Sequence, residues 1–239
     1  MKLVKAKLKN RLLRLRLRGR RLPPLARGNL HALDHLDPAR PARDYSFVVV
    51  DLETTGLDLQ KDRVVSVGAL RLAQGRVRLG EIFSELVNPG RDIPPESIKI
   101  HGIKPDQVAG ARKASQVFQD FLAFLGSDIL VAHYAGFDLH FINFTMKRLY
   151  GFPLQNLVLD TVRMCRNLLL PSDPYGVAEH TRRCNLDALC ERFAIQVPER
   201  HTSLGDALAT ALIFQRLLAR LEKNNTGTLG ELLRAAALD

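Results

Sequence analysis

The stretch FVVVDLETTG, residues 47–56, joins an apolar run to two acids, Asp51 and Glu53. Such a run of β-branched and aromatic residues is typical of a buried strand. Residues i and i+2 of a strand point to the same face, so both carboxylates should project together while Leu52 faces the core. Carboxylates held side by side repel each other, and a nearby cation relieves the repulsion. The alternative is a strand that ends in solvent, where the repulsion between paired acids costs little free energy.

Two later motifs add an acid each. Asp138 ends VAHYAGFD, just beyond a second apolar run, at the expected first turn of a helix, where the helix dipole alone favours an acid. Asp206 ends HTSLGD and fits an S-x-x-D capping box with Ser203, which gives it a structural alternative. His201, five residues earlier, cannot share a helical face with Asp206. We therefore expect His201 on the loop before the helix, where it could carry protons.

The order of the expected elements predicts the fold class. Strands are expected at 44–51, 63–72, 76–87 and 128–133, with a hairpin at 73–75 and a loop at 88–97. Helices are expected at 115–125, 137–150, 185–193 and 203–222, with a short one within 226–239. Strands come first and then alternate with helices, which predicts an α/β fold with a mixed β-sheet flanked by α-helices.

Composition sets further limits. The 239 residues suffice for one domain with a sizeable core, and no apolar run approaches the roughly 20 residues of a membrane span. The three cysteines, Cys165, Cys184 and Cys190, form no CxxC pair. We therefore expect a cytoplasmic protein whose thiols are buried or idle.

The net charge of +10 is concentrated at the N-terminus. Residues 1–27 hold 11 Lys and Arg and no acid, which leaves 24 basic and 25 acidic residues in a nearly neutral body. With the prolines that follow, this predicts a basic N-terminal arm and linker at 1–44, a main domain at 45–222 and a short helical extension at 223–239.

The arm has several interpretations. Leu and Arg alternate over 13–18 as in a strand, whereas Leu8, Leu12 and Leu15 have helical spacing. Such a segment could hold nucleic acid, bind an anionic membrane surface or dock on a partner. Disorder in solvent is the usual state of a charge run. We expect the arm to supply sequence-independent affinity for the phosphate backbone of nucleic acid.

Together the motifs resemble those of the DEDDh 3′→5′ exonucleases, which share an RNase H-like fold. The resemblance rests on DLETTG (51–56), VAHYAGFDLHFIN (131–143) and HTSLGDALAT (201–210). PPESIKIHGI (94–103) and the segments at 159–169 and 185–193 are similar to the proofreading branch, represented by the epsilon subunit of bacterial DNA polymerase III. His201 in place of Tyr marks the DEDDh rather than the DEDDy subgroup.

The resemblance implies a role for each of the five residues. Asp51 would bridge two divalent ions, Mg²⁺ or Mn²⁺, and Glu53 and Asp206 would complete the site of one of them. Asp138 would hold the second ion, and His201 would be the general base for the attacking water. The chemistry fits these residue types. Hard oxygen ligands suit such ions, and an unperturbed His, with a pKa of about 6.5, accepts a proton near neutral pH.

The same resemblance implies substrate contacts. The residues expected to contact the terminal nucleotide are Glu96 and His101, with Thr54, Thr55 and Leu57 lining the pocket for its sugar and base. Tyr134 stands where many relatives have Asn. It could stack on a base, or simply pack at a strand end.

The predicted function is two-metal-ion hydrolysis at the 3′ end of single-stranded DNA, in proofreading or repair. RNA trimming, as by RNase T or oligoribonuclease, is the first alternative, because discrimination rests on one 2′-OH contact. A non-catalytic nucleic-acid-binding module is the second, although all five catalytic positions are filled. The expected partners are single-stranded DNA or RNA and a DNA polymerase or another replication or repair protein.

Overall fold

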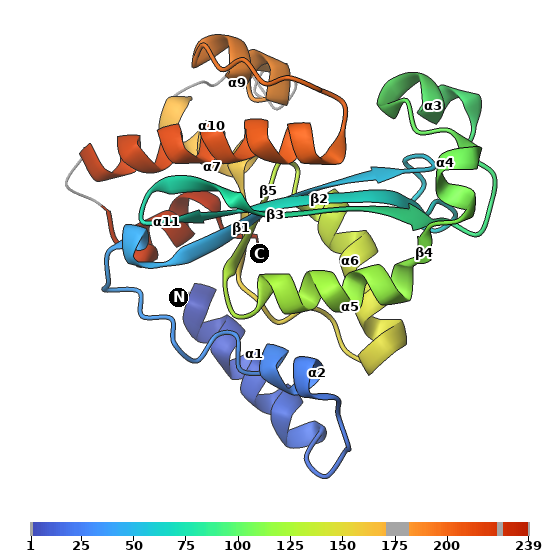
Figure 1. Cartoon of the computed structure of the whole chain (residues 1–239). Coiled ribbons are helices and arrows are strands. Elements are labelled where there is room, and N and C mark those ends of the chain that lie inside the picture. The colour runs from blue at the N-terminus through green and yellow to red at the C-terminus, as the bar shows by residue number, and fades with distance from the viewer. Residues whose placement is uncertain (1, 171–181, 224–226, 239) are drawn as a thin grey trace.

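The computed structural model describes residues 2–170, 182–223 and 227–238, and they form a sheet covered by helices on both faces (Figure 1). The sheet has six strands in the order β4-β3-β2-β1-β5-β6. These are β1 (Ser46–Thr54), β2 (Val64–Ala73), β3 (Arg76–Asn88), β4 (Arg112–Lys113), β5 (Ile129–Ala132) and β6 (Val158–Asp160). β1 pairs antiparallel with β2 and parallel with β5, so the sheet is mixed, as the sequence predicts.

The connection between β2 and β3 is the expected hairpin. The ladder runs to the pair Ala73 and Arg76, which leaves Gln74 and Gly75 as a two-residue turn. Both turn residues have positive φ, 54° and 68°, the pattern whose twist suits antiparallel strands. The turn sets the register from Arg71 to Arg78, and an irregularity between Leu70 and Arg71 shifts it beyond that point.

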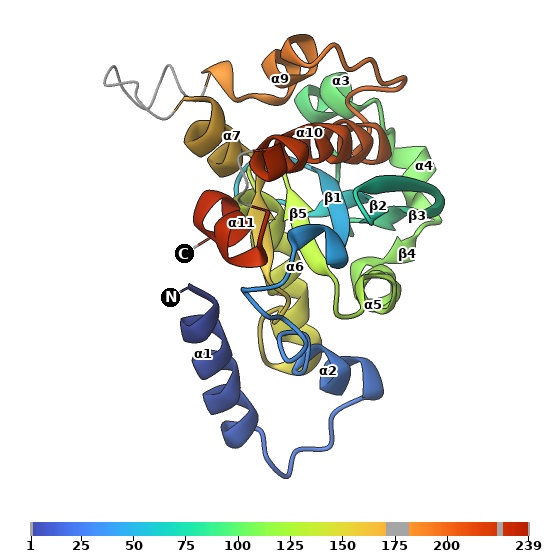
Figure 2. The same ribbon diagram turned by 90° about the vertical axis from the view of Figure 1, so that its left-hand side faces the viewer.

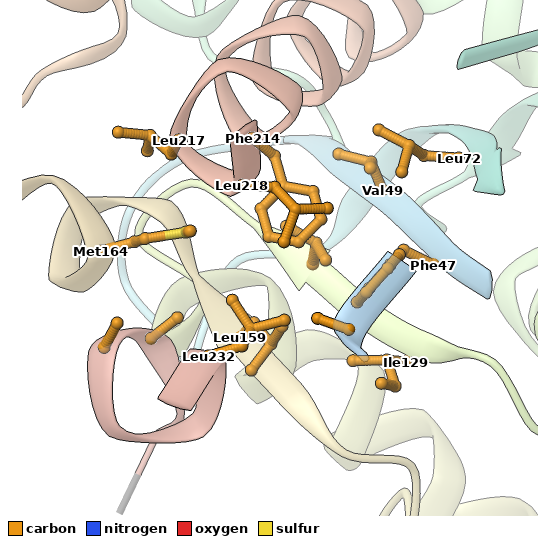
Figure 3. Packing of buried hydrophobic residues seen from close by; sticks show 14 of the residues in the cluster. Phe47, Val49, Leu72, Ile129, Leu159, Met164, Phe214, Leu217, Leu218 and Leu232 are labelled. Carbon is orange, nitrogen blue, oxygen red and sulfur yellow. The ribbon is translucent and has the colours of Figure 1, made fainter. Parts of the chain in front are cut away.

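The strongly apolar sequence of β1 supplies both cores. Phe47 and Val49 face a core under α10 (Ser203–Lys223), where Phe47 meets Phe214 edge to face with ring centroids 4.9 Å apart (Figure 3). Val48 and Val50 face the opposite core. Further helices complete the two layers: α7 (Thr161–Leu169) and α9 (Leu186–Arg192) on the α10 side, and α5 (Ala114–Leu125) and α6 (Gly136–Tyr150) on the other side (Figure 1).

Several short elements differ from the expectations. The predicted loop at 88–97 ends early, because α3 (Pro95–His101) begins with a proline, whose fixed φ suits the first helical turn. α4 (Pro105–Ala109), β4, β6 and the helix at Thr161–Leu169, α7, were not predicted. The expected C-terminal helix is present as α11 (Leu229–Ala236), capped by a Thr228–Glu231 capping box.

The basic arm is folded, so the expectation of disorder in solvent is wrong. It forms α1 (Lys2–Arg16), α2 (Pro24–Asn29) and the 3₁₀ turn η1 (Ala42–Asp44). Leu3 joins the α10-side core, and Leu17, Ala26 and Leu30 join the opposite one. The segment is helical, as the spacing of Leu8, Leu12 and Leu15 suggested, but α1 packs onto the body through other residues, Leu3, Ala6 and Leu13.

The arm packs beneath the α5 and α6 layer (Figures 1 and 2). Its buried polar side chains bond to the segment between α6 and β6: Asn10 donates to Gln155 over 3.0 Å, and Asn29 donates to Asn156 over 2.5 Å. The outer face of α1 carries four large apolar residues that are 58–68% exposed, Val4, Leu8, Leu12 and Leu15.

The cysteines are not all idle, which corrects the prediction. Cys165 of α7 forms a disulfide with Cys184, whereas Cys190 is free and buried. Sequence spacing gave no signal for this pair, because 19 residues separate the two positions. In the described ranges, no helix has the length and apolarity that a bilayer crossing requires.

Candidate active site

Three carboxylates meet where β1 ends. Ligand oxygens of Asp51, Glu53 and Asp206 all lie within 4.8 Å of one another. Leu52 between the first two is 5% exposed and points into the core, so the period-2 prediction is confirmed. Strand geometry brings Asp51 and Glu53 together, and α10 brings Asp206 to them.

Asp138 is the fourth acid of the group. It lies in the first turn of α6, as predicted, and its side chain is buried. Its Oδ1 accepts a hydrogen bond of 3.1 Å from the backbone N–H of Leu52. That bond fixes the carboxylate beside the strand segment that carries Asp51 and Glu53.

Two residues of β2 set the position of α10. Gly68 lies opposite Asp51 in the ladder, and a side chain there would overlap the backbone of Ser203 and Leu204. Ser66, opposite Glu53, shares a hydrogen bond of 2.6 Å with the hydroxyl of Ser203. The first turn of α10 therefore rests directly on β2, beside the two strand carboxylates.

The predicted capping box of α10 is wrong. The Thr202 hydroxyl, not that of Ser203, accepts from the N–H of Gly205, over 3.1 Å. Ser203 is committed to Ser66, and Asp206 accepts instead from the backbone N–H of His201, over 3.3 Å. The side chain of Asp206 is thus turned toward the loop and the acidic cluster.

His201 is on the loop before α10, as predicted, and its side chain is exposed. Its φ is +63°, and that of Glu199 is +58°, an uncommon conformation for residues with a side chain. Gly205 permits this turn, because a Cβ there would overlap the carbonyl oxygen of Glu199. The loop is therefore held tightly against the helix that carries Asp206.

Arg200 is a residue of this site that the sequence analysis missed. Its Nε lies 2.5 Å from Asp206 Oδ1, and its Nη1 lies 2.8 Å from Asp187 Oδ1. Its charge also stabilises the ionised form of Asp51. Its position next to His201 was the only available signal, because nothing in the sequence indicates that α9 supplies Asp187.

Burial and nearby carboxylates make Asp51, Glu53 and Asp138 hard to ionise. Burial, followed by the charges of Asp138, Glu53 and Asp206, raises the pKa of Asp51 well above its ordinary value. Burial and the charges of Asp206 and Asp138 raise the pKa of Glu53 to about 8. Burial also raises the pKa of Asp138 to about 8, against the hydrogen bond from Leu52. A cation in this cluster would remove the repulsion, and all its donors are hard oxygens.

The five expected substrate contacts are not equally accessible. Leu57 is 83% exposed, and Glu96 is exposed on α3. Thr54 and Thr55 are buried, and their hydroxyls donate to the Gly56 carbonyl and to Asp62 respectively. His101 is 6% exposed, and burial lowers its pKa. Their proposed roles therefore differ: the first two could touch a ligand, and the others support the walls of the site.

Tyr134 is 38% exposed and adopts a φ of +58°. Its backbone N–H donates to Asp160 Oδ1 over 3.2 Å, and its ring stands edge to face on His133. It is therefore only partly packed, so part of the side chain faces solvent, where a ligand could reach it.

Comparison with known proteins shows one family whose model covers all of these residues. The family model described as Exonuclease, RNase_T, matches residues 48–214, which include all four acids and His201. A DNA polymerase III subunit epsilon-like protein of Rhodobacter capsulatus is 43% identical over 81% of this chain. The chain spans 26% of that relative and 83% of the DNA polymerase III subunit epsilon of Aquifex aeolicus, with which it shares 34% identity over 74% of its own length.

Solved structures share the fold. The nuclease domain of 3′hExo, a DEDDh family member, bound to rAMP, has a TM-score of 0.63 and 16% identity, covering 79% of this chain and 97% of that one. E. coli Exonuclease I in complex with a dT13 oligonucleotide has a TM-score of 0.61 and 17% identity, covering 76% of this chain and 42% of that one. The predicted RNase H-like fold is confirmed.

The contact at Gly68 yields a first prediction. Gly68→Ala should destabilise the protein by about 1–3 kcal/mol, because the methyl group must displace the start of α10. It should also weaken Mn²⁺ binding, because Asp206 moves with that turn. Thermal unfolding and Mn²⁺ titration measure the two effects. Gly80→Ala is the matched control on β3, where an added Cβ meets nothing within 4 Å. Equal Mn²⁺ affinity in both variants would contradict this placement of α10.

The raised pKa values yield a second prediction. Between pH 5 and about 8 the folded, metal-free protein keeps protons on these acids that the unfolded chain has lost, so their contribution to stability falls as pH rises. In EDTA, Asp51→Asn should be more stable than the native protein at pH 8, by about 1–2 kcal/mol, and the gap should shrink at pH 5. Asp106→Asn, an exposed acid of α4, is the control. A gap that grows as pH falls would overturn the electrostatic account.

Proposed function

Because the chain belongs to the exonuclease (RNase_T) family, we propose that it removes nucleotides from the 3′ end of single-stranded DNA. The observation that carries the proposal is the convergence of Asp51, Glu53 and Asp206 within 4.8 Å, next to the loop of His201. Hydrolysis of a phosphodiester needs a means to offset the anionic charge of the phosphate and a base for the attacking water, and this group of residues offers both.

The donor set fits divalent cations. We propose that Asp51, Glu53 and Asp206 hold one ion and that Asp51 and Asp138 hold a second, Mg²⁺ or Mn²⁺ in each case. Two such ions, when bound, activate the water and stabilise the leaving 3′ oxygen. The raised pKa values of Glu53 and Asp138 support this assignment, because cations favour the ionised carboxylates that the protein alone disfavours.

We assign the proton transfer to His201. Its imidazole is exposed on a tightly held loop, and its backbone N–H is anchored to Asp206, so it lies beside the acids without being a metal ligand. There it would accept the proton of the attacking water. Asp138 would keep its position through the bond from Leu52, and Arg200 would hold Asp206 on the side facing the loop.

The terminal nucleotide would lie between the exposed residues around the carboxylates. Leu57 offers an apolar contact for its base or sugar, Glu96 on α3 offers an acceptor for a hydroxyl, and the exposed part of the Tyr134 side chain offers a stacking surface. Thr54, Thr55 and His101 would shape this pocket from beneath.

RNA is the alternative substrate, and the solved complexes of similar fold include both rAMP and DNA. A non-catalytic binding module is less favoured, because such a module would not need four acids whose charges oppose an anionic ligand. We propose a polymerase or another replication or repair protein as partner, from the printed names of the relatives. We also propose the cytoplasm, although the Cys165–Cys184 disulfide is uncommon for that compartment.

Two variants test the catalytic assignment. Asp51→Asn should abolish degradation of a 5′-labelled DNA strand, as should EDTA with the native protein. His201→Ala should reduce kcat by about 10²–10⁴-fold while leaving Mn²⁺ affinity nearly unchanged, because the substitution removes a base and no ligand. Full activity in excess EDTA would contradict the metal role. An active His201→Ala protein that binds Mn²⁺ weakly would mean that His201 has been given the wrong role.

The polarity and the sugar are tested with the same assay. Strands of DNA and RNA, each blocked at the 3′ or the 5′ end, distinguish the proposed activity from its alternatives. Protection by the 3′ block alone supports 3′→5′ removal. Faster degradation of RNA than of DNA would favour the trimming alternative.

For the arm, we propose that residues 1–44 form an extension that contacts the phosphate backbone of longer strands, with 45–222 as the catalytic unit and 223–239 as a second extension. The arm lies against the segment after α6, at the opposite end of that helix from Asp138. Lys5, Lys9, Arg11 and Arg16 are exposed on α1. Short substrates would therefore not reach them.

Substitution tests the arm better than deletion, because Leu17, Ala26 and Leu30 belong to a core. Changing Lys5, Lys9, Arg11 and Arg16 to Gln should flatten the slope of log K against log salt by about 0.7 for each phosphate of a single strand that the arm no longer neutralises. Cleavage of very short strands should not change. Leu8→Gln with Leu12→Gln is the control on the apolar stripe. The nucleic-acid role is refuted if the Lys and Arg substitutions leave binding of single strands unchanged, while the Leu8→Gln and Leu12→Gln pair weakens binding to anionic vesicles or to a partner protein.

A further inference from the structure

The solvent face of α6 is hollowed. Residues spaced i, i+3, i+4, i+7 and i+8 share one helical face, and here they line a hollow of about 410 Å³: His140, Asn143, Phe144, Lys147 and Arg148. Phe144 is 39% exposed, although the opposite face of the helix supplies buried core residues such as Phe141 and Ile142. None of these five residues has a role in the proposed chemistry.

One end of this hollow adjoins the loop that follows the Asp51–Glu53 strand. Asp138 stands on the same helix two residues before His140, but about 200° around the helix axis, so its buried side chain points to the opposite face. His140 Nε2 lies 2.7 Å from the carbonyl oxygen of Leu59, in the loop that follows the Asp51–Glu53 strand. The face therefore begins at the loop that also carries the exposed Leu57, one of the residues proposed to contact the terminal nucleotide.

The face is positively charged and carries an aromatic ring. The guanidinium carbons of Arg63 and Arg148 lie 5.4 Å and 5.6 Å from the centre of the Phe144 ring. The Arg63 guanidinium donates to the backbone carbonyls of residues 60–62. In the described parts of the chain no carboxylate forms an ion pair with Arg63, Lys147 or Arg148. A smaller hollow next to it is also lined by Arg63 and Phe144.

The other end of the face reaches the arm. α6 spans about 20 Å over its 15 residues and ends just before Gly151. The guanidinium of Arg20 lies there, with Nη1 3.3 Å from the position that a Cβ on Gly151 would take. Cations on and beside the helix thus lead from the carboxylates toward the arm, which lies on the same side of the sheet as α6 (Figure 1).

We propose that this α6 face, with its residues Phe144, Lys147 and Arg148 and with Arg63 of the loop before β2 beside it, binds the single strand on the 5′ side of the nucleotide being removed. The cations would contact successive phosphates, and Phe144 would stack on one base. This inference rests on the proposed function, because it extends the same substrate beyond the catalytic site. It also gives the strand a route from the carboxylates to the arm.

Binding of 5′-labelled single strands in EDTA tests the proposal without cleavage. Lys147→Gln with Arg148→Gln should weaken binding of a strand of about 20 nucleotides and flatten its salt slope by about 1.4. Phe144→Leu should weaken binding about tenfold with an unchanged slope, because it removes stacking and no charge. Both effects should be larger for the long strand than for one of about three nucleotides.

The control is Arg216→Gln with Arg220→Gln, two exposed cations of α10 on the opposite face of the sheet. It removes the same charge and should leave affinity, slope and cleavage near native values. If the α6 variants bind the long strand with native affinity and native salt slope, and the native protein cleaves short strands, this inference is overturned and the proposed function stands. A native protein that neither binds nor cleaves single strands would overturn the proposed function and this inference together.

Discussion

Electrostatic repulsion among four carboxylates is the constraint on which the site depends. Asp51 and Glu53 cannot separate, because they share one face of a strand whose other residues are fixed in two cores. Asp138 is tied to the N–H between them, and Asp206 is carried in by α10. The protein supplies a cation of its own, Arg200, which contacts Asp206 from the loop side. The fold therefore maintains an arrangement that is electrostatically unfavourable without added cations, as expected where binding of a divalent ion is the function.

The rest of the structure opposes relaxation of this cluster. Gly68 and the bond between Ser66 and Ser203 hold the first turn of α10 on β2, so Asp206 cannot withdraw. The left-handed conformation of His201 is fixed by the same turn, through the bond from its N–H to Asp206. A single packing contact thus positions both a prospective metal ligand and the prospective base. The strain of the loop and the repulsion of the acids lie in the same place, as is common at functional sites.

Patterns of neighbouring residues predicted those elements whose conformation depends mainly on neighbouring residues. The alternation in β1, the hairpin at Gln74 and Gly75, and the helical spacing of α5 follow from neighbouring residues, and the structure confirms them. Contacts between distant segments were not predictable from one sequence. Arg200 reaches Asp187 of another helix, Thr202 replaces Ser203 as the cap because Ser66 competes for Ser203, and Cys165 meets Cys184 only in the folded chain. The charge of the arm suggested disorder in solvent, whereas several of its apolar residues pack into the cores of the folded chain.

The most direct test of the account measures protons released when the carboxylates bind a cation. Titration calorimetry with Mn²⁺ at pH 7, in two buffers of different ionisation enthalpy, gives both the stoichiometry and the number of protons released. Since the pKa values of Glu53 and Asp138 are about 8 in the metal-free protein, the account predicts two ions per chain and a net release of protons. Binding with no proton release, or no binding at all, would contradict the claim that repulsion among these acids defines the site.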